Sequence, residues 1–322
     1  MEPRKIIKIG EKSYAITLPK KWANILGLKP GDSVNLILDK TGVIHVHLVS
    51  RKPKSTVPSI VIEASKLDID DVEEYIRGCY IEGLDSVTIK NFRQAETEVT
   101  ELNEILLKLP GVLLLEPGFE DIVLKIAITE EVINVEEVIT RMTRVLDMMF
   151  DNFEKYINTR NKEYAELVLK LDDELDRLDH LGQRLIRKRA KTKILSSREY
   201  LDLLDSLTII LNIEHIGDCL DRSIRVLLNK EDRWYKLRDQ ITEVIQIARK
   251  IVFDTLSGIK YPSIRLVKNI KKKRRELKKI IYDILISEPE LSGSMNEFEI
   301  ISTLCMDLSE INVYRLVRSM AT

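Results

Sequence analysis

Residues 168–185 read VLKLDDELDRLDHLGQRL, and the apolar positions of this stretch decide the fold of most of the chain. Its valine and leucines recur every three or four residues, at positions 168, 171, 175, 178, 181 and 185. That spacing puts them on one face of an α-helix, and such a face is normally buried against other helices. The stretch therefore predicts one helix of a helical bundle.

The same pattern extends on both sides of this stretch. No proline occurs between Pro117 and Pro262, and the periodic pattern is interrupted only near residues 158–161, 193–197, 229–232, 258–262 and 288–293. These breaks predict six helices of roughly 20–30 residues with short connections, which is typical of a bundle. We expect residues 131–322 to form this bundle as two three-helix repeats in tandem.

Acidic residues repeat at helical spacing in two of the predicted helices. Asp172 and Asp176 lie one turn apart in the second, Glu214 and Asp218 lie one turn apart in the third, and Asp221 extends that face. Like charges at this spacing repel, so such pairs are sensible where a cation lies between the helices. We predict one metal site with ligands from these five residues.

The ligand type limits which metal suits this site. Carboxylates without thiolates favour Mg²⁺, Mn²⁺, Ca²⁺ or iron over zinc. Gly217 lies inside the motif, and a glycine in the middle of a helix usually marks close packing or function. His215 is interpreted as an ordinary side chain beside the site, and a solvated acidic face is the alternative to a metal site.

Residues 58–130 predict a small α+β domain. Strands are expected at 59–63, 86–90, 112–115 and 122–128, and helices at 69–81 and 95–109. Glu116-Pro117-Gly118 is expected to separate the last two strands. The segment shows no catalytic spacing, so we interpret it as an acidic spacer or assembly module.

Residues 1–50 predict a small strand-rich domain. Strands are expected at 5–9, 14–18, 34–38 and 43–48, with a short helix at 20–26 between Pro19 and Gly27. Lys29-Pro30-Gly31-Asp32 predicts a turn. A unit of this size buries little apolar surface, so we expect it to form a dimer or to pack on a neighbour.

Opposite charges are segregated along the chain. Residues 1–54 hold 11 basic and 4 acidic side chains, residues 58–130 hold 6 and 16, and residues 131–322 hold 34 and 32. The net charge of −1 taken alone argues against nucleic-acid binding, but it conceals a strongly basic N-terminal segment. Such a segment can neutralise DNA phosphates. The alternative for the N-terminal segment is a generically basic small domain that does not bind DNA. For the basic run at residues 271–275, the alternative to a binding surface is a solvated helix face.

The composition also excludes several classes of protein. No apolar run reaches the roughly 18–20 residues of a membrane span, and Met1–Ile7 lacks a signal-peptide pattern. Three widely spaced cysteines suit a reducing cytoplasm without disulfides. An enzyme is not expected, since no nucleophile–base pair, phosphate loop or dinucleotide fingerprint occurs. The chain contains only four glutamines but many charged residues, and this bias is typical of proteins from hot environments.

The N-terminal segment resembles the AbrB/SpoVT/MazE-type swapped-hairpin DNA-binding domains. Gly10–Trp22 and Leu26–Asp32 match the family's pattern of a glycine, a strand ending in Leu-Pro-Lys, a short helix and Gly-Leu-x-x-Gly-Asp. The resemblance implies a two-fold dimer that binds double-stranded DNA. The residues expected to contact DNA are Arg4, Lys5, Lys8, Lys12, Ser13, Tyr14, Thr17, Lys20 and Lys21.

Residues 131–322 resemble PhoU, a protein of two three-helix repeats. Ile213–Asp218 is similar to the family's Glu-Arg-Ile-Gly-Asp, with His215 in place of the arginine. In the second repeat, Lys271 and Arg275 align with Asp172 and Asp176, so at most one metal cluster is expected. PhoU proteins bind metal without a known turnover, which implies a regulator.

Together the two resemblances describe an archaeal PhoU-like regulator with an AbrB-type head, and the middle domain matches no family. We expect a cytoplasmic, DNA-binding transcriptional regulator of phosphate uptake that acts as a homodimer or higher oligomer. The alternatives are an adaptor that binds a phosphate-transport ATPase and an architectural DNA-binding protein.

Overall fold

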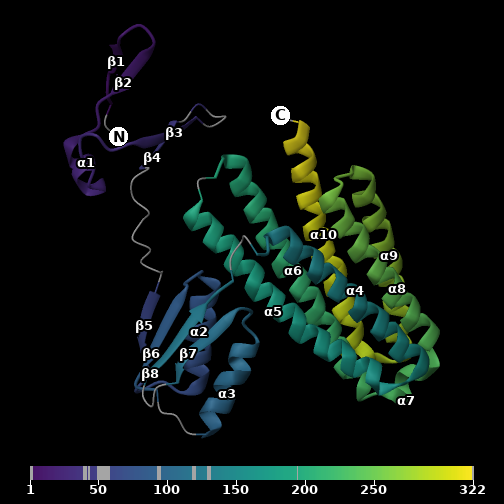
Figure 1. Ribbon diagram of the computed structural model, residues 1–322. Helices are drawn as coiled ribbons and strands as arrows, with labels where there is room; N and C mark the ends of the chain where they lie inside the picture. Colours follow the sequence, from purple (N-terminus) through teal and green to yellow (C-terminus); the bar gives the residue numbers. More distant parts are fainter. Residues whose placement is uncertain are drawn as a thin grey trace. The chain divides into compact units, whose positions relative to one another are not determined.

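A computed structural model of the chain describes residues 3–38, 42, 44–48, 59–92, 96–117, 121–128, 132–193 and 195–320. Backbone contacts divide the chain into two compact units, Met1–Thr56 and Val57–Thr322. Figure 1 shows the elements of each unit, coloured along the sequence.

In its described residues, the first unit contains two antiparallel hairpins and one short helix. Its elements are β1 (Ile6–Ile9), β2 (Ser13–Ile16), α1 (Lys20–Leu26), β3 (Val34–Leu38) and β4 (Ile44–Leu48). β1 pairs with β2, and β3 pairs with β4. Each strand and the helix lie within two residues of the bounds expected from the sequence.

The turn after α1 depends on two glycines. Gly27 ends the helix in the left-handed region at a φ of 61°, which a residue without Cβ adopts at no steric cost. Gly31 has a φ of 94°. The Lys29 N–H donates a hydrogen bond of 2.8 Å to the Asp32 side chain, which closes the predicted turn.

Among the side chains of this unit whose burial the structure describes, Pro19 is the one that is buried, and they form no apolar core. The register of β3 with β4 places Val34, Leu36 and Leu38 on the same face as Val46 and Ile44. These five side chains are 39–70% exposed. A two-stranded hairpin with an uncovered apolar face is at best marginally stable in water, so this face requires a partner surface.

The second unit begins with a four-stranded sheet and two helices. Its elements are β5 (Ser59–Glu63), α2 (Ile69–Ile81), β6 (Ser86–Lys90), α3 (Glu96–Leu107), β7 (Val112–Pro117) and β8 (Asp121–Ile126). The strand order is β5-β6-β8-β7, and only the β5–β6 pair, which α2 connects, is parallel. Val87, Ile89 and Leu124 of the sheet form a core with Ile76 and Tyr80 of α2.

The last hairpin of this sheet differs from the expectation. The sequence places Glu116 and Pro117 in a turn, whereas β7 continues to Pro117, which lies opposite Ile122 of β8. The register shifts between Leu114 and Glu116. β7 is an edge strand, where a proline is tolerated because no further strand requires its missing N–H.

In the part of the chain that the structure describes, six long helices follow, as the periodicity predicts. They are α4 (Val135–Thr159), α5 (Lys162–Thr192), α6 (Ser197–Leu228), α8 (Arg238–Lys260), α9 (Ile264–Ser287) and α10 (Ser292–Met320). The short helices α7 (Glu231–Trp234) and η1 (Tyr235–Leu237) connect the two repeats, and η2 (Pro289–Leu291) precedes α10. Among the described residues, no helix combines the length and the apolar character needed to cross a membrane.

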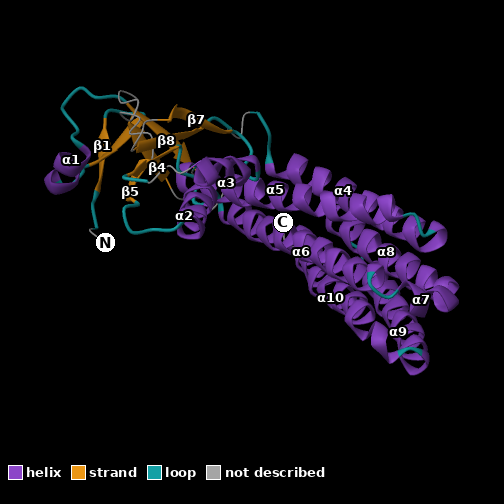
Figure 2. Cartoon of the chain, turned by 90° about the horizontal axis from the view of Figure 1, so that it is seen from below, coloured by secondary structure: helices purple, strands orange, loops and turns teal. Residues whose placement is uncertain are grey.

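The two three-helix repeats pack around one shared core. Figure 2 shows the long helices lying side by side along much of their length. In the core, Phe153 of α4 meets Phe298 of α10 with ring centroids 5.8 Å apart. Gly182 lets α5 approach α6 closely, because a Cβ there would lie 2.5 Å from Ile210 Cδ1.

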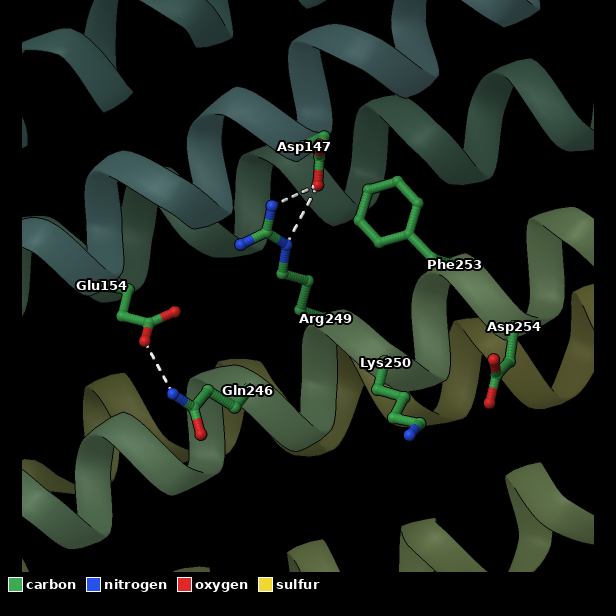
Figure 3. Close-up of a pocket in the computed structure, with 7 residues that line it drawn as sticks. All are labelled: Asp147, Glu154, Gln246, Arg249, Lys250, Phe253 and Asp254. Carbon is green, nitrogen blue, oxygen red and sulfur yellow. Dashed lines mark hydrogen bonds and ion pairs between the residues drawn. The ribbon is translucent and has the colours of Figure 1, made fainter.

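Polar side chains also join the first helices of the two repeats at a surface hollow between α4 and α8 (Figure 3). Arg249 donates from Nε and Nη2 to Asp147 Oδ1 at 3.0 and 2.6 Å. Gln246 donates to Glu154 at 2.7 Å. These bonds fix the register of α4 against α8.

A buried arginine fastens the sheet domain to the bundle. Arg184 of α5 is fully buried and donates from Nη1 to the carbonyl oxygens of Tyr80 and Leu84, at 3.0 and 2.7 Å. Its Nη2 binds Asp85 at 2.7 Å, and Lys188, one turn further along α5, binds the same carboxylate. The Leu84 carbonyl, just after α2, thus finds a donor on α5, and the Tyr80 carbonyl at the end of α2 accepts from Arg184 as well as from the Gly83 N–H.

Candidate functional site

Three of the predicted metal ligands converge between α5 and α6. Asp176 comes from α5, and Glu214 and Asp218 come from successive turns of α6. Each offers one oxygen, and these oxygens lie within 4.8 Å of one another. All three residues are partly buried. The i,i+4 spacing seen in the sequence thus places two carboxylates of α6 opposite one of α5.

Gly217 brings Asp172 into the neighbourhood of these three residues. A Cβ on Gly217 would lie 2.4 Å from Leu175 Cδ1 and 3.2 Å from Asp172 Oδ1. The absence of a side chain therefore permits the close packing of α5 on α6 at this level. The mid-helix glycine noted in the sequence has a packing role at the edge of the carboxylate group.

The carboxylates impede one another's ionisation. Burial raises the pKa of Asp172 to about 8, with further contributions from Asp221, Asp176, Asp218 and Glu214. Burial and like charges likewise raise the pKa of Glu214 to about 7 and that of Asp176 to about 6. A bound cation would offset this repulsion.

Two predicted ligands already have arginine partners. Arg225 makes two bonds to Asp221, from Nε at 2.6 Å and from Nη2 at 2.9 Å. Asp221 is not one of the three residues whose oxygens converge. Arg222 binds Asp218 at 2.9 Å and reaches Glu297 of α10 at 3.2 Å, so a metal at Asp218 competes with this arginine.

Asp179 was missed in the sequence and belongs to the same region. It is 6% exposed, burial raises its pKa to about 6, and its charge contributes to the raised pKa of Glu214. Gln183 donates to Oδ2 at 2.8 Å, while Oδ1 is buried and has no hydrogen-bond partner in the described part of the chain. Asp172, Asp176 and Asp179 stand at i, i+4 and i+7, and this spacing already places all three on one face of the helix in the sequence.

This donor set fits a hard cation. It consists of carboxylate oxygens, several of which are half-buried and resist ionisation when no cation is near. Mg²⁺, Mn²⁺, Ca²⁺ and iron accept such ligands. His215 is exposed and lies outside the convergent group.

The predicted DNA-binding residues all lie in the first unit, and all nine are exposed. Lys8 of β1 lies directly opposite Tyr14 of β2, and Lys12 lies in the turn between these strands. Lys20 and Lys21 begin α1 directly after Pro19. Ser13 and Thr17 lie at the start of β2 and just beyond its end.

Acidic residues are few in this part of the chain. Residues 3–38 contain two acidic residues, Glu11 and Asp32, and seven basic ones. Asp32 is engaged with the backbone of its own turn. The described part of the unit therefore presents an excess of cations, which favours phosphate contacts.

Comparison with known families identifies two segments. Residues 7–59 match the family model described as antidote-toxin recognition MazE, bacterial antitoxin, and residues 139–226 match the PhoU domain. The chain contains a MazE/AbrB-type domain and a PhoU domain. The PhoU match covers the first repeat from α4 to α6, including all five predicted metal ligands. No curated protein and no solved structure matches the chain.

Proposed function

We propose that this protein is a cytoplasmic, DNA-binding transcriptional regulator that acts as a homodimer and controls phosphate uptake or homeostasis. The proposal rests on the first unit, which matches the MazE family model and exposes both a set of cationic side chains and an uncovered apolar face. The PhoU domain supports the phosphate theme.

A second copy of the first unit is the partner that fits its apolar face. The exposed residues of β3 and β4 are regularly alternating aliphatic side chains, which pair well with an identical strand surface. Dimerisation would place two copies of the Lys8, Lys12 and Lys20 region on one two-fold assembly. Such an assembly suits a DNA site with two symmetric halves.

The bundle would act as the sensor. A metal held by Asp176, Glu214 and Asp218, with Asp172 beside them, would stabilise the packing of α5 on α6. α5 also carries Arg184, which binds the end of α2. Metal occupancy would therefore favour one position of α5, the helix to which the sheet domain is attached. We assign this region to sensing and propose no catalytic turnover, which a phosphatase assay on the metal-loaded protein can test.

DNA affinity across a salt series tests the proposal. In Lys12→Ala/Lys20→Ala, binding to duplex DNA should weaken and the slope of log K against log salt should fall, by about 0.9 for each phosphate that the variant no longer neutralises. Lys170→Ala/Lys236→Ala removes two exposed lysines of the bundle and serves as the control. Unchanged affinity and slope in the first variant would contradict DNA binding by the head.

An adaptor for a phosphate-transport ATPase is the second candidate, favoured by the PhoU match. In that case the head would serve for dimerisation alone. Affinity purification from cells separates the two functions. Recovery of transporter subunits with DNA at background favours the adaptor, and recovery of discrete DNA fragments favours the regulator. Even coverage of the genome would indicate an architectural protein.

A further inference from the structure

The second helix of the second repeat, α9, has the opposite charge character to its counterpart in the first repeat. Its 24 residues contain nine basic and two acidic side chains. Lys271 and Arg275 stand at i,i+4 spacing, as Asp172 and Asp176 do on α5. A pair of this kind repels a metal ion and attracts an anion.

Most of these cations are exposed. Val267, Ile270, Leu277, Ile281 and Ile284 are buried and anchor the inner face of α9 to the bundle. The exposed basic residues of the helix are Arg265, Lys268, Lys271, Lys272, Arg275, Lys278 and Lys279. At 100° per residue, these seven side chains lie within less than half of the helix circumference, so they form one face of α9. We call this set the α9 basic face.

The bundle neutralises little of the α9 basic face. Lys278 reaches Glu299 of α10 at 3.3 Å. Lys273, which lies outside the set, binds Asp254 of α8. Within the described part of the chain, the other six members of the basic face make no hydrogen bond or ion pair. Their charges are therefore available to an external partner.

A hollow of about 360 Å³ lies at the edge of the basic face that adjoins α10. It is lined by Lys271, Arg274, Arg275, Lys278 and Met306. Arg274 is held in place from α10, since it donates to Thr303 at 2.9 Å and to Ser302 at 3.3 Å. A fixed guanidinium beside a second arginine and two lysines suits the oxygens of a phosphate group.

The length of the basic face distinguishes a polyanion from a single ion. Arg265 and Lys279 are 14 residues apart, which corresponds to about 21 Å along the helix. One small anion in the hollow would leave most of these cations unused. Duplex DNA presents one negative charge about every 1.7 Å along its axis, so a straight row of cations can engage several phosphates.

We propose that the α9 basic face is a second DNA-binding surface that contacts the sugar–phosphate backbone. Its cations would neutralise backbone phosphates, and such contacts add affinity without carrying sequence information. The choice of double-stranded DNA as the polyanion rests on the proposed function of the head. When one surface is bound to the duplex, the other is held near the same duplex at a high effective concentration. The two surfaces together therefore raise the affinity of the chain for DNA, without any additional contact at the head.

The test compares two triple variants of the full chain on one duplex across a salt series. Lys271→Gln/Arg275→Gln/Lys279→Gln removes three charges from the basic face. Lys170→Gln/Lys236→Gln/Lys250→Gln removes three exposed charges elsewhere on the bundle. The first variant should lose at least tenfold in affinity at about 100 mM salt, and its salt slope should fall by about 2 to 3 per chain. The control should stay within about twofold of the parent.

The other outcomes overturn the proposal in distinguishable ways. One outcome is that the two triple variants show equal affinity and equal salt slope while Lys12→Ala/Lys20→Ala still binds more weakly. This result would leave the head as the DNA-binding surface and exclude α9 from DNA binding. Absence of DNA binding by the parent overturns the proposed function as well. Inorganic phosphate binding that only the α9 variant loses, with DNA affinity unchanged, indicates a small-anion site. The same pattern with phosphatidylserine vesicles indicates a membrane surface.

Discussion

At the scale of single residues, the positions that matter most are those where α5 and α6 approach each other. Gly217 allows this approach, and the carboxylates around it make the contact electrostatically unfavourable unless they are protonated or bind a cation. Packing and charge thus oppose each other within one turn of helix. Each contribution can be changed separately.

Gly217→Ala tests the packing. The added Cβ would lie 2.4 Å from Leu175 Cδ1, and Leu175 is fully buried, so its side chain cannot move aside without repacking the core. The free energy of unfolding should therefore fall by about 1–3 kcal/mol despite the better helix propensity of alanine. Gly78→Ala in α2 is the matched control, because no atom lies within 4 Å of its Cβ position. That control should gain up to about 1 kcal/mol in urea denaturation. Equal effects at both positions would contradict the account of Gly217.

The pH dependence of stability tests the charges. A carboxyl whose pKa is raised by folding stabilises the folded state when it is protonated, and this contribution is lost as the pH rises through the folded pKa. With Asp172 at about 8, Glu214 at about 7 and Asp176 at about 6, the melting temperature of the metal-free protein should rise as the pH falls from 8 towards 5.

Asp176→Asn changes this charge dependence. At pH 8 without metal, the loss of one like charge should raise the free energy of unfolding by about 1 kcal/mol, after allowance for partial exposure. Mn²⁺ should raise the melting temperature of the parent, more at pH 8 than at pH 6, and have little effect on the variant. Glu166→Gln, at an exposed position of α5 outside the convergent group, is the control. A response to Mn²⁺ that is equal in Asp176→Asn and the parent argues against the site.

At the scale of elements, α5 links two functions. One part of the helix carries Asp172 and Asp176, and Arg184 and Lys188 lie two to three turns further on, at the sheet domain. Because both groups lie on one continuous helix, we expect a change at the carboxylates to alter the attachment as well. The strength of that attachment depends on Arg184.

Arg184→Met should weaken the attachment strongly. The change leaves the carbonyl of Leu84 without its buried donor and removes one of two donors from the Tyr80 carbonyl and from the Asp85 carboxylate. This loss should cost about 1–3 kcal/mol. Arg187→Met removes an exposed arginine that reaches Glu82 at 3.4 Å, and should cost less than about 1 kcal/mol. Guanidinium denaturation should show the sheet domain unfolding earlier in the first variant only. A single unchanged transition in both variants would exclude this role.

The sequence predicts these elements well and their contacts poorly. Apolar periodicity gives the six long helices, and glycine and proline give the turns around α1, because these signals are local. The extension of β7 to Pro117 depends on an edge position that no local pattern encodes. Arg184 lies in a run that resembles a solvated basic helix end, and its burial depends on carbonyls about 100 residues away. The metal-ligand pattern predicts the three converging residues, but not the pairing of Asp221 with Arg225.

At the scale of the whole molecule, the account requires a dimer of the first unit. Leu36→Glu places a charge on the apolar face of β3, where Leu36 is 66% exposed in the single chain. The dimer dissociation constant should rise at least about tenfold, since a buried unpaired charge is strongly unfavourable. Lys29→Glu, in the turn before β3, should leave it nearly unchanged. Sedimentation equilibrium measures both, and an unaffected dimer in Leu36→Glu would show that another surface mediates assembly.

The measurement that tests the central claim most directly is genome-wide mapping of DNA cross-linked to the full chain, in phosphate-rich and phosphate-starved cells. A dimeric regulator with a basic head should occupy discrete, two-fold symmetric sites, with occupancy that changes with phosphate supply, and the Lys12→Ala/Lys20→Ala chain should lose them. Uniform coverage of the genome, or recovery no greater than that of this variant, would contradict the claim.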